Sequence, residues 1–235
     1  MNVPVSLFAE TNLQFVLSRA TPEARVILVV LALFSVFAWY MMVFKGVQMR
    51  RAKKLNLYFD SEFRAQTNVL ATYDRSLEVT GCPFFTVYQE GCRELDARLK
   101  AGGAARRARL GLKSMEHIKR TIESAVAREA IKLESGLILL ASAVSGGPFL
   151  GLLGTVWGVM DTFADVGQAQ SASLEHMAPG VSAALITTVA GLLVAIPSMF
   201  GYNFLVHSLR VQTVELDNFA QEMVSKMETE YLTED

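Results

Sequence analysis

The sequence has 235 residues, of which 51% are hydrophobic and 19% charged, and its formal net charge is −1 at pH 7. Of its 22 Lys and Arg residues, all except Arg19, Arg25, Arg210 and Lys226 lie between Lys45 and Lys132. This separation of apolar from basic segments is typical of a membrane protein, so the net charge says little about partners. No nucleic-acid partner is expected, because basic residues beside apolar spans are expected to face anionic lipid head groups.

The N-terminal part of the chain predicts a surface segment followed by a membrane span. Residues 1–25 lack the basic start and cleavage site of a signal peptide, and we interpret them as a periplasmic amphipathic segment lying on the bilayer. Thr21 and Pro22 are typical of a helix start, with Thr21 as the N-cap. Residues 26–44 contain no charged side chain and predict the first transmembrane helix.

A basic run follows the first span and predicts the orientation of the chain: Lys45, Arg50, Arg51, Lys53 and Lys54. Basic residues beside a span favour the cytoplasmic side, so the N-terminus is expected outside the cell membrane and the C-terminus inside. Residues 45–134 show helical spacing of apolar residues and predict a cytoplasmic helical domain, with a break at Gly81–Pro83. No helix stop is evident before Ser135, so the last of these helices is expected to run directly into the second span.

The two cysteines, Cys82 and Cys92, lie in this basic segment and have neither metal-ligand nor redox spacing. In a cytoplasmic domain they are expected to be reduced thiols. No metal site and no cofactor are predicted.

The predicted second span, residues 135–163, has small residues on one helix face. Residues 136–160 contain no ionisable side chain and are long enough to cross a hydrocarbon core of about 30 Å. Four glycines follow one another at steps of four, three and four residues: Gly147, Gly151, Gly154 and Gly158. Thr155 lies in the same stripe and is its one hydroxyl residue. Two interpretations are open: tight packing of two helices, or a smooth groove that slides against, or conducts past, a partner helix. Trp157 is expected to pack in the core.

The remaining chain predicts a loop, a third span and a long final helix. Residues 164–180 contain acidic but no basic side chains, which predicts a short periplasmic loop. Residues 181–206 predict the third span, and residues 207–235 a cytoplasmic helix that continues it. Small residues also share one face of this span: Gly180, Ala184, Thr187, Thr188, Gly191, Ala195 and Ser198. Pro148 and Pro197 lie inside the second and third spans and are expected to act as hinges. The first span has no such face, so we expect it to face lipid.

Three segments of this all-α chain resemble the TolQ/ExbB family of inner-membrane motor subunits, within the MotA/TolQ/ExbB proton channel superfamily. They are residues 34–39 (FSVFAW), residues 149–160 (FLGLLGTVWGVM) and residues 177–192 (MAPGVSAALITTVAGL). Length and the short N-terminus favour a TolQ-like member. One residue departs from the pattern: Ala183 stands where many members have a glutamate.

The resemblance implies a homopentamer whose second and third helices line a pore. A dimer of a single-span partner similar to TolR or ExbD would lie in that pore with a membrane aspartate, and a TolA/TonB-like protein would carry force across the envelope. Two threonines would line the ion path, Thr155 and Thr188, with Thr187 beside them. The pore-face packing residues would be Gly147, Gly151, Gly154, Gly158, Ala184 and Gly191.

The residues themselves are compatible with that role. A proton switch needs a titratable side chain, and residues 26–44, 136–160 and 181–206 contain no Asp, Glu, His, Lys or Arg, so we expect a second subunit to supply it. Threonine hydroxyls both donate and accept hydrogen bonds, so they suit a carboxylate in either protonation state. Whether the ion is H⁺ or Na⁺, and whether the load is Tol-like or Exb-like, stays open. The alternative is a passive scaffold or channel. An intramembrane enzyme is disfavoured, because no nucleophile–base pair or metal ligand lies at membrane depth.

Overall fold

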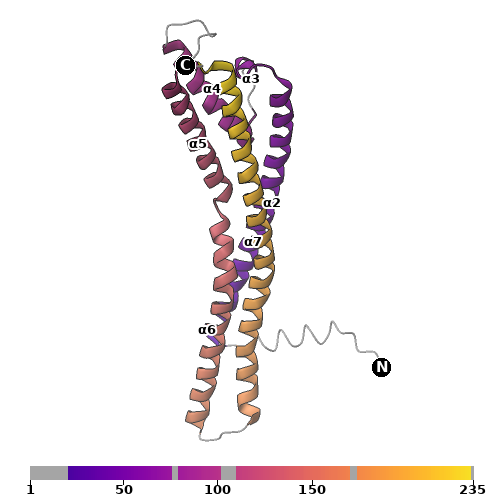
Figure 1. The fold of residues 1–235 in the computed structure, drawn as a ribbon. Helices are drawn as coiled ribbons and strands as arrows, with labels where there is room; N and C mark the ends of the chain where they lie inside the picture. Colours follow the sequence, from indigo (N-terminus) through magenta and orange to yellow (C-terminus); the bar gives the residue numbers. More distant parts are fainter. Residues whose placement is uncertain (1–20, 76–78, 102–109, 170–173, 234–235) are drawn as a thin grey trace, which may run out of the picture. The chain divides into compact units, whose positions relative to one another are not determined.

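The computed structural model describes residues 21–75, 79–101, 110–169 and 174–233 (Figure 1). These residues form helices and contain no strand, only one isolated bridge between Leu110 and Leu232. The helices are α2 (Pro22–Ala65), α3 (Ala71–Asp74), α4 (Pro83–Ala101), α5 (Leu112–Glu134), α6 (Leu137–Ala169) and α7 (Leu174–Tyr231). Three of them, α2, α6 and α7, are long and apolar enough to cross a membrane. The predicted all-α membrane fold is therefore confirmed.

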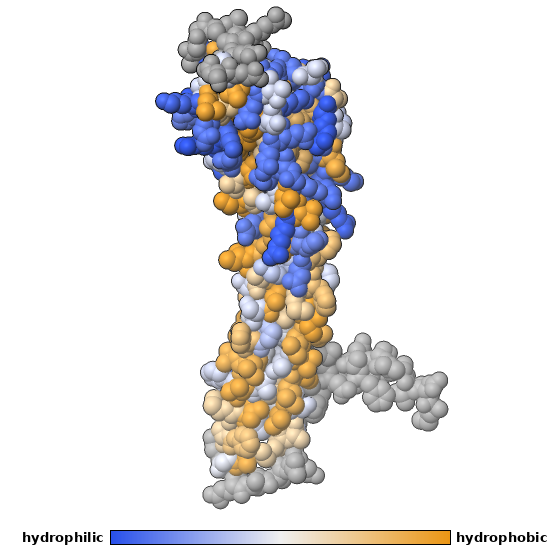
Figure 2. All heavy atoms as spheres, viewed as in Figure 1, coloured by the Kyte–Doolittle hydropathy of each residue, from blue (hydrophilic) through white to orange (hydrophobic). Residues whose placement is uncertain are grey.

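The chain divides into two compact units. Of the described residues, those within 21–43 and 136–204 form the first, which we call the membrane unit, and those within 44–135 and 205–233 form the second, which we call the helical domain. Figure 2 shows mainly hydrophobic residues on the surface of the membrane unit and many hydrophilic residues on that of the helical domain. Helices α2 and α7 each contribute residues to both units.

Helix α2 begins as its sequence predicts. Its first residue is Pro22, and the Ala24 N–H donates to the Thr21 hydroxyl oxygen at 3.3 Å, so Thr21 is the N-cap. In the membrane unit, one face of α2 packs against the other spans through Ile27 and Leu31, which cluster with Val194 of α7. The opposite face is exposed and apolar, as expected of a helix that faces lipid.

The helical domain is built on a cluster of aromatic side chains. Phe59 and Phe63 of α2 make edge-to-face contacts with Tyr88 of α4 and with Phe219 of α7, at centroid distances between 5.1 and 6.0 Å. Phe84 stacks on Phe219 at 4.5 Å. Such pairs add about 0.5–1.5 kcal/mol each beyond their apolar burial, so they hold the α2, α4 and α7 segments of this domain together.

A break separates α5 from α6, which corrects the expectation of one continuous helix into the second span. Helix α5 ends at Glu134, Ser135 has an extended ψ of 135°, and Gly136 has a φ of +84° before α6 begins at Leu137. A positive φ at the residue after a helix cap is a common helix end, and glycine adopts it without steric cost. The signal was Ser135–Gly136 itself, which lies between two strongly helical patterns. By contrast, α7 is continuous to Tyr231, as predicted.

The predicted loop is also mostly helical. Of residues 164–180, residues 164–169 extend α6 and residues 174–180 begin α7. Loop prediction relied on acidic residues, but Asp161 and Asp165 are compatible with the solvated end of a helix. The amphipathic segment predicted within residues 1–25 lies outside the described residues, except for its last five positions.

Candidate functional site

The two small-residue stripes meet at the contact between α6 and α7. All four glycines of the α6 stripe are buried and face α7: Gly147, Gly151, Gly154 and Gly158. A Cβ atom on Gly151 would lie 2.8 Å from the carbonyl oxygen of Thr187, and one on Gly158 would lie 2.8 Å from Cβ of Ala184. Only residues without a side chain allow backbones to approach this closely, so the geometry supports the packing interpretation of the stripe.

The facing residues of α7 are equally crowded. A Cβ atom on Gly191 would lie 3.1 Å from the Gly151 Cα atom, and Ala184 is 1% exposed. The close contact also extends past the predicted α6 stripe to Thr162, whose Cγ2 would lie 3.2 Å from a Cβ on Gly180. Sequence reasoning missed Thr162, although it lies four residues after Gly158 and continues the spacing of the stripe. The predicted role of the glycines, Ala184 and Gly191 on a pore face stays a prediction.

The predicted threonines come together in the middle of this contact. The hydroxyls of Thr155 and Thr188 are hydrogen-bonded to each other across the two helices. Both also reach the carbonyl oxygen of Gly151, each at 3.1 Å, and Thr187 donates to the same carbonyl at 3.0 Å. The structure thus places the hydroxyls of all three residues around one carbonyl oxygen, whose backbone is accessible because Gly151 has no side chain.

The three threonines differ in accessibility. Thr187 is fully buried, and its one hydroxyl hydrogen is shared between the carbonyl oxygens of Gly151 and of Ala184, the latter at 2.7 Å, so this hydroxyl has no hydrogen left for another group. Thr155 and Thr188 are half-buried, and each hydroxyl oxygen has lone pairs beyond the bond that it donates. An approaching polar group can therefore reach Thr155 and Thr188 but not Thr187. The role of all three in an ion path stays a prediction.

Apolar side chains surround the accessible pair. Leu152 and Val156 of α6 are 54% and 58% exposed, and Leu185 and Val189 of α7 are 54% and 53% exposed. The described residues contain no group of three His, Cys, Asp or Glu side chains that could hold a metal ion. The pair is therefore an isolated polar spot on an apolar surface, suited to one polar group carried by another membrane helix or by lipid.

Comparison with known proteins identifies the family. The model of the MotA/TolQ/ExbB proton channel family matches residues 93–218. The chain belongs to this family. The chain is 32% identical to the Tol-Pal system protein TolQ of Pseudomonas aeruginosa, with 82% of each chain covered. It is 31% identical to the biopolymer transport protein ExbB of Xanthomonas campestris, over 84% of this chain and 79% of that one. It is also 30% identical to TolQ of Haemophilus influenzae, over 92% of this chain and 94% of that one.

The MotA/TolQ/ExbB match includes the whole threonine cluster and the close contact around it. It also includes Ala183, which is 4% exposed in the structure. Relatives named TolQ and relatives named ExbB have similar identities to this chain, so the comparisons do not separate the two kinds of load.

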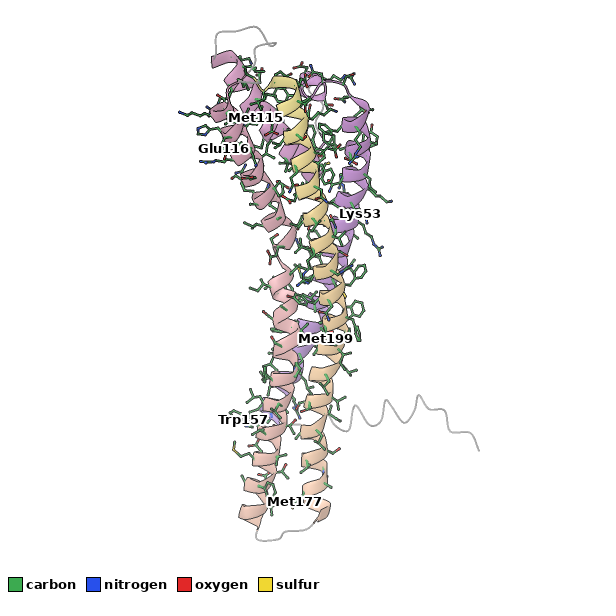
Figure 3. The ribbon with its side chains drawn as sticks, in the orientation of Figure 1. Lys53, Met115, Glu116, Trp157, Met177 and Met199 are labelled. Carbon is green, nitrogen blue, oxygen red and sulfur yellow. The ribbon has the colours of Figure 1, made fainter. Side chains whose placement is uncertain are left out.

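Two prolines and a tryptophan that the sequence analysis singled out lie away from the threonine cluster or have no tested role. Pro148 and Pro197 lie inside the continuous helices α6 and α7, and their role as hinges stays a prediction. The expectation for Trp157 was wrong: it is 41% exposed on α6 and points away from α7 (Figure 3). The reason is that the glycines occupy the packed face and Trp157 lies between Gly154 and Gly158 on another one.

Two further contacts were missed by the sequence reasoning. A Cβ on Gly201 of α7 would lie 2.9 Å from Cγ of Met42, so this glycine allows α2 to approach α7. In the helical domain, the buried Lys45 amine donates to the carbonyl oxygen of Leu133 at 3.3 Å and thereby caps the end of α5. A lysine that ends an apolar span indicates membrane orientation and gives no sign of a distant capping partner.

Proposed function

We propose that this protein is an inner-membrane ring subunit of a motor driven by an ion motive force. In this proposal several copies, five by analogy with the family, surround a dimer of a single-span partner similar to TolR or ExbD. The motor transduces energy to the cell envelope through a TolA/TonB-like protein. Membership of the proton channel family supports the general role.

The single observation that carries the proposal is the half-buried hydroxyl pair in helix segments that have no acidic or basic side chain. Thr155 and Thr188 lie between two helices whose charge-free segments are residues 136–160 and 177–206. Ion transfer at that depth needs a carboxylate, and burying one without partners would be costly. A protonated aspartate of the partner would donate to a free lone pair of either hydroxyl, and a charged one would accept a hydroxyl hydrogen that is otherwise bonded to the Gly151 carbonyl.

The close packing of α6 and α7 supports this role in a second way. A hydroxyl can select or relay an ion only if its position is fixed before the ion arrives. Gly151 and Gly154 allow the two helix backbones to approach, and the Gly151 carbonyl then orients the threonine hydroxyls. In the proposed ring the glycines stabilise the hairpin of α6 and α7, and Thr155 and Thr188 meet the partner.

The basic run after the first span supports the orientation of the chain. Lys45, Arg50 and Arg51 begin this run directly after the uncharged segment. By the positive-inside rule, the helical domain and the C-terminus are cytoplasmic and the N-terminus is periplasmic. Proton entry from the periplasm would then reach the threonine pair from the end of the spans that carries Asp161 and Asp165.

The proposal is tested by co-purification from native membranes with a neighbouring single-span protein, followed by measurement of the mass of the complex in detergent. We expect a ring of about five copies that retains the small partner. Replacement of the partner's membrane Asp by Asn should abolish proton flux in proteoliposomes without disassembling the ring. A homo-oligomer that never retains a partner, or undiminished envelope function in the Asn variant, would favour a passive scaffold or channel.

A further inference from the structure

The helical domain contains a cleft that the proposed motor does not use. It encloses about 620 Å³ between α2, the start of α4 and α5. Side chains of three kinds line it: the cations Arg51 and Lys132, the carboxylate of Glu129, and the apolar residues Phe44, Val47 and Leu133. The start of α4 contributes Gly81 and Pro83.

The cleft lies next to two predicted membrane boundaries along the chain. Phe44 is the last residue of the uncharged first span, and Leu133 lies two positions before the predicted second span at residue 135. Both boundaries belong to the basic, cytoplasmic side of the predicted topology. In the predicted topology, two segments that are distant in the sequence therefore put the cleft near the lipid head groups of the inner leaflet.

The charges in the cleft leave one cation available. Lys132 is paired with Glu129 through a contact of 2.6 Å between Nζ and Oε1, and Glu129 is only 8% exposed. Arg51 is exposed and has no ion pair among the described residues. Two cations and one carboxylate give the lining a net charge of +1, which favours an anion. A guanidinium is well suited to phosphate, because its planar N–H groups bind two oxygens at once.

The apolar wall indicates what carries the anion. Phe44 and Val47 are 51% and 61% exposed beside the cationic residues. A free phosphate would leave both side chains uncovered, whereas the glycerol and first acyl carbons of a lipid would cover them. The cleft thus combines a cation that suits a phosphate group with an apolar wall that suits the start of an acyl chain.

We infer that this cleft binds the head group of an anionic phospholipid of the inner leaflet. Arg51 binds the phosphodiester, the neutral Lys132–Glu129 pair lies beside it, and Phe44 and Val47 contact the base of the acyl chains. The inference concerns a lipid site and does not depend on the motor.

The test is native mass spectrometry of the complete membrane complex in detergent, titrated with dioleoyl phosphatidylglycerol, dioleoyl phosphatidylcholine or inorganic phosphate. Arg51→Gln is compared with the matched control Lys53→Gln, which removes the same charge two residues away. Lys53 is exposed, does not line the cleft, and points away from the neighbouring helices (Figure 3). Because both side chains are exposed, neither substitution is expected to unfold the domain, and circular dichroism verifies this.

We expect phosphatidylglycerol to be retained in preference to phosphatidylcholine. Arg51→Gln should weaken that binding about tenfold, the effect of losing a charge-assisted hydrogen bond, and Lys53→Gln by less than about twofold. Val47→Ser should weaken lipid binding and leave phosphate binding unchanged. Equal losses for Arg51→Gln and Lys53→Gln would overturn the site, because they would indicate unspecific surface attraction. Equal binding of phosphate and phosphatidylglycerol would overturn the lipid as its occupant.

Discussion

Removal of the Thr155 hydroxyl by mutation tests whether this group serves ion transfer or only helix packing. Thr155→Val replaces the hydroxyl with a methyl group of nearly the same size and keeps the β-branched shape, so it opens no cavity. The substitution removes the one hydroxyl hydrogen that Thr155 can donate to the carbonyl oxygen of Gly151 at 3.1 Å or of Ala184 at 3.4 Å, and it removes the contact with Thr188.

The structural cost of this change is small. Thr188 and Thr187 still donate to the Gly151 carbonyl, so that acceptor stays satisfied. A hydrogen bond between membrane helices contributes about 0.6 kcal/mol on average, and a typical intramolecular one about 1 kcal/mol. We therefore expect a loss of stability of about 1 kcal/mol, too little to dissociate α6 from α7 or to prevent assembly.

The functional cost is expected to be large if Thr155 meets the partner's carboxylate. Thr155→Val should assemble with the partner at wild-type levels and lose proton flux in proteoliposomes and envelope integrity in cells. Thr155→Ser, which restores the hydroxyl, should recover both. The matched control is Thr162→Val, because the Thr162 hydroxyl also donates to a carbonyl one turn back, that of Gly158 at 2.7 Å, outside the cluster.

Two results would refute the reasoning. Normal flux and normal envelope integrity in Thr155→Val would leave the hydroxyl with a packing role only. An equal loss in Thr162→Val and Thr155→Val, with reduced assembly in both, would mean that the effect comes from helix packing.

Three further predictions concern the packing of the chain. Gly151→Ala should destabilise the protein by about 1–3 kcal/mol, because the new Cβ would lie 2.8 Å from a backbone oxygen. The control Gly146→Ala would meet no atom within 4 Å and should be neutral or stabilising, and thermal unfolding in detergent compares the two variants. Gly136→Ala should cost about 1–2 kcal/mol in the same assay because of its φ of +84°, and a cost no greater than that of Gly146→Ala would contradict the helix break. Burial raises the pKa of the Cys82 and Cys92 thiols, so both stay protonated at pH 8 in the folded protein. Iodoacetamide should therefore modify them far more slowly than in denaturant, as measured by mass spectrometry, and rapid labelling of the native protein would contradict their burial.

The sequence alone was sufficient for the spans and for singling out the three threonines that the structure brings together. Uncharged stretches long enough to cross the hydrocarbon core can be recognised without knowledge of contacts, because the bilayer disfavours charge at any position along the span. The N-cap at Thr21 and the long final helix were also predictable, since caps and helical periodicity are local signals.

Local sequence signals failed to predict the helix break where a signal for helix continuation lay next to a signal for a helix end. Ser135 and Gly136 stand between two helical patterns, and periodicity favoured continuity while the glycine favoured a break. The backbone of Gly136 shows that the break was the better choice. The predicted loop failed for a related reason, because acidic residues indicate solvent exposure and do not exclude a helix.

The sequence by itself determined which residues are small, polar or apolar on each helix face, and hence that α6 and α7 carry glycine and threonine stripes. Only the tertiary structure decided that these stripes face each other, that Thr187 is enclosed, and that Thr155 and Thr188 stay accessible. The physical reason is that a periodic pattern fixes the direction of side chains around one helix axis. The rotation of that helix against its neighbour is fixed by contacts between residues far apart in the chain, such as Gly151 and Thr187.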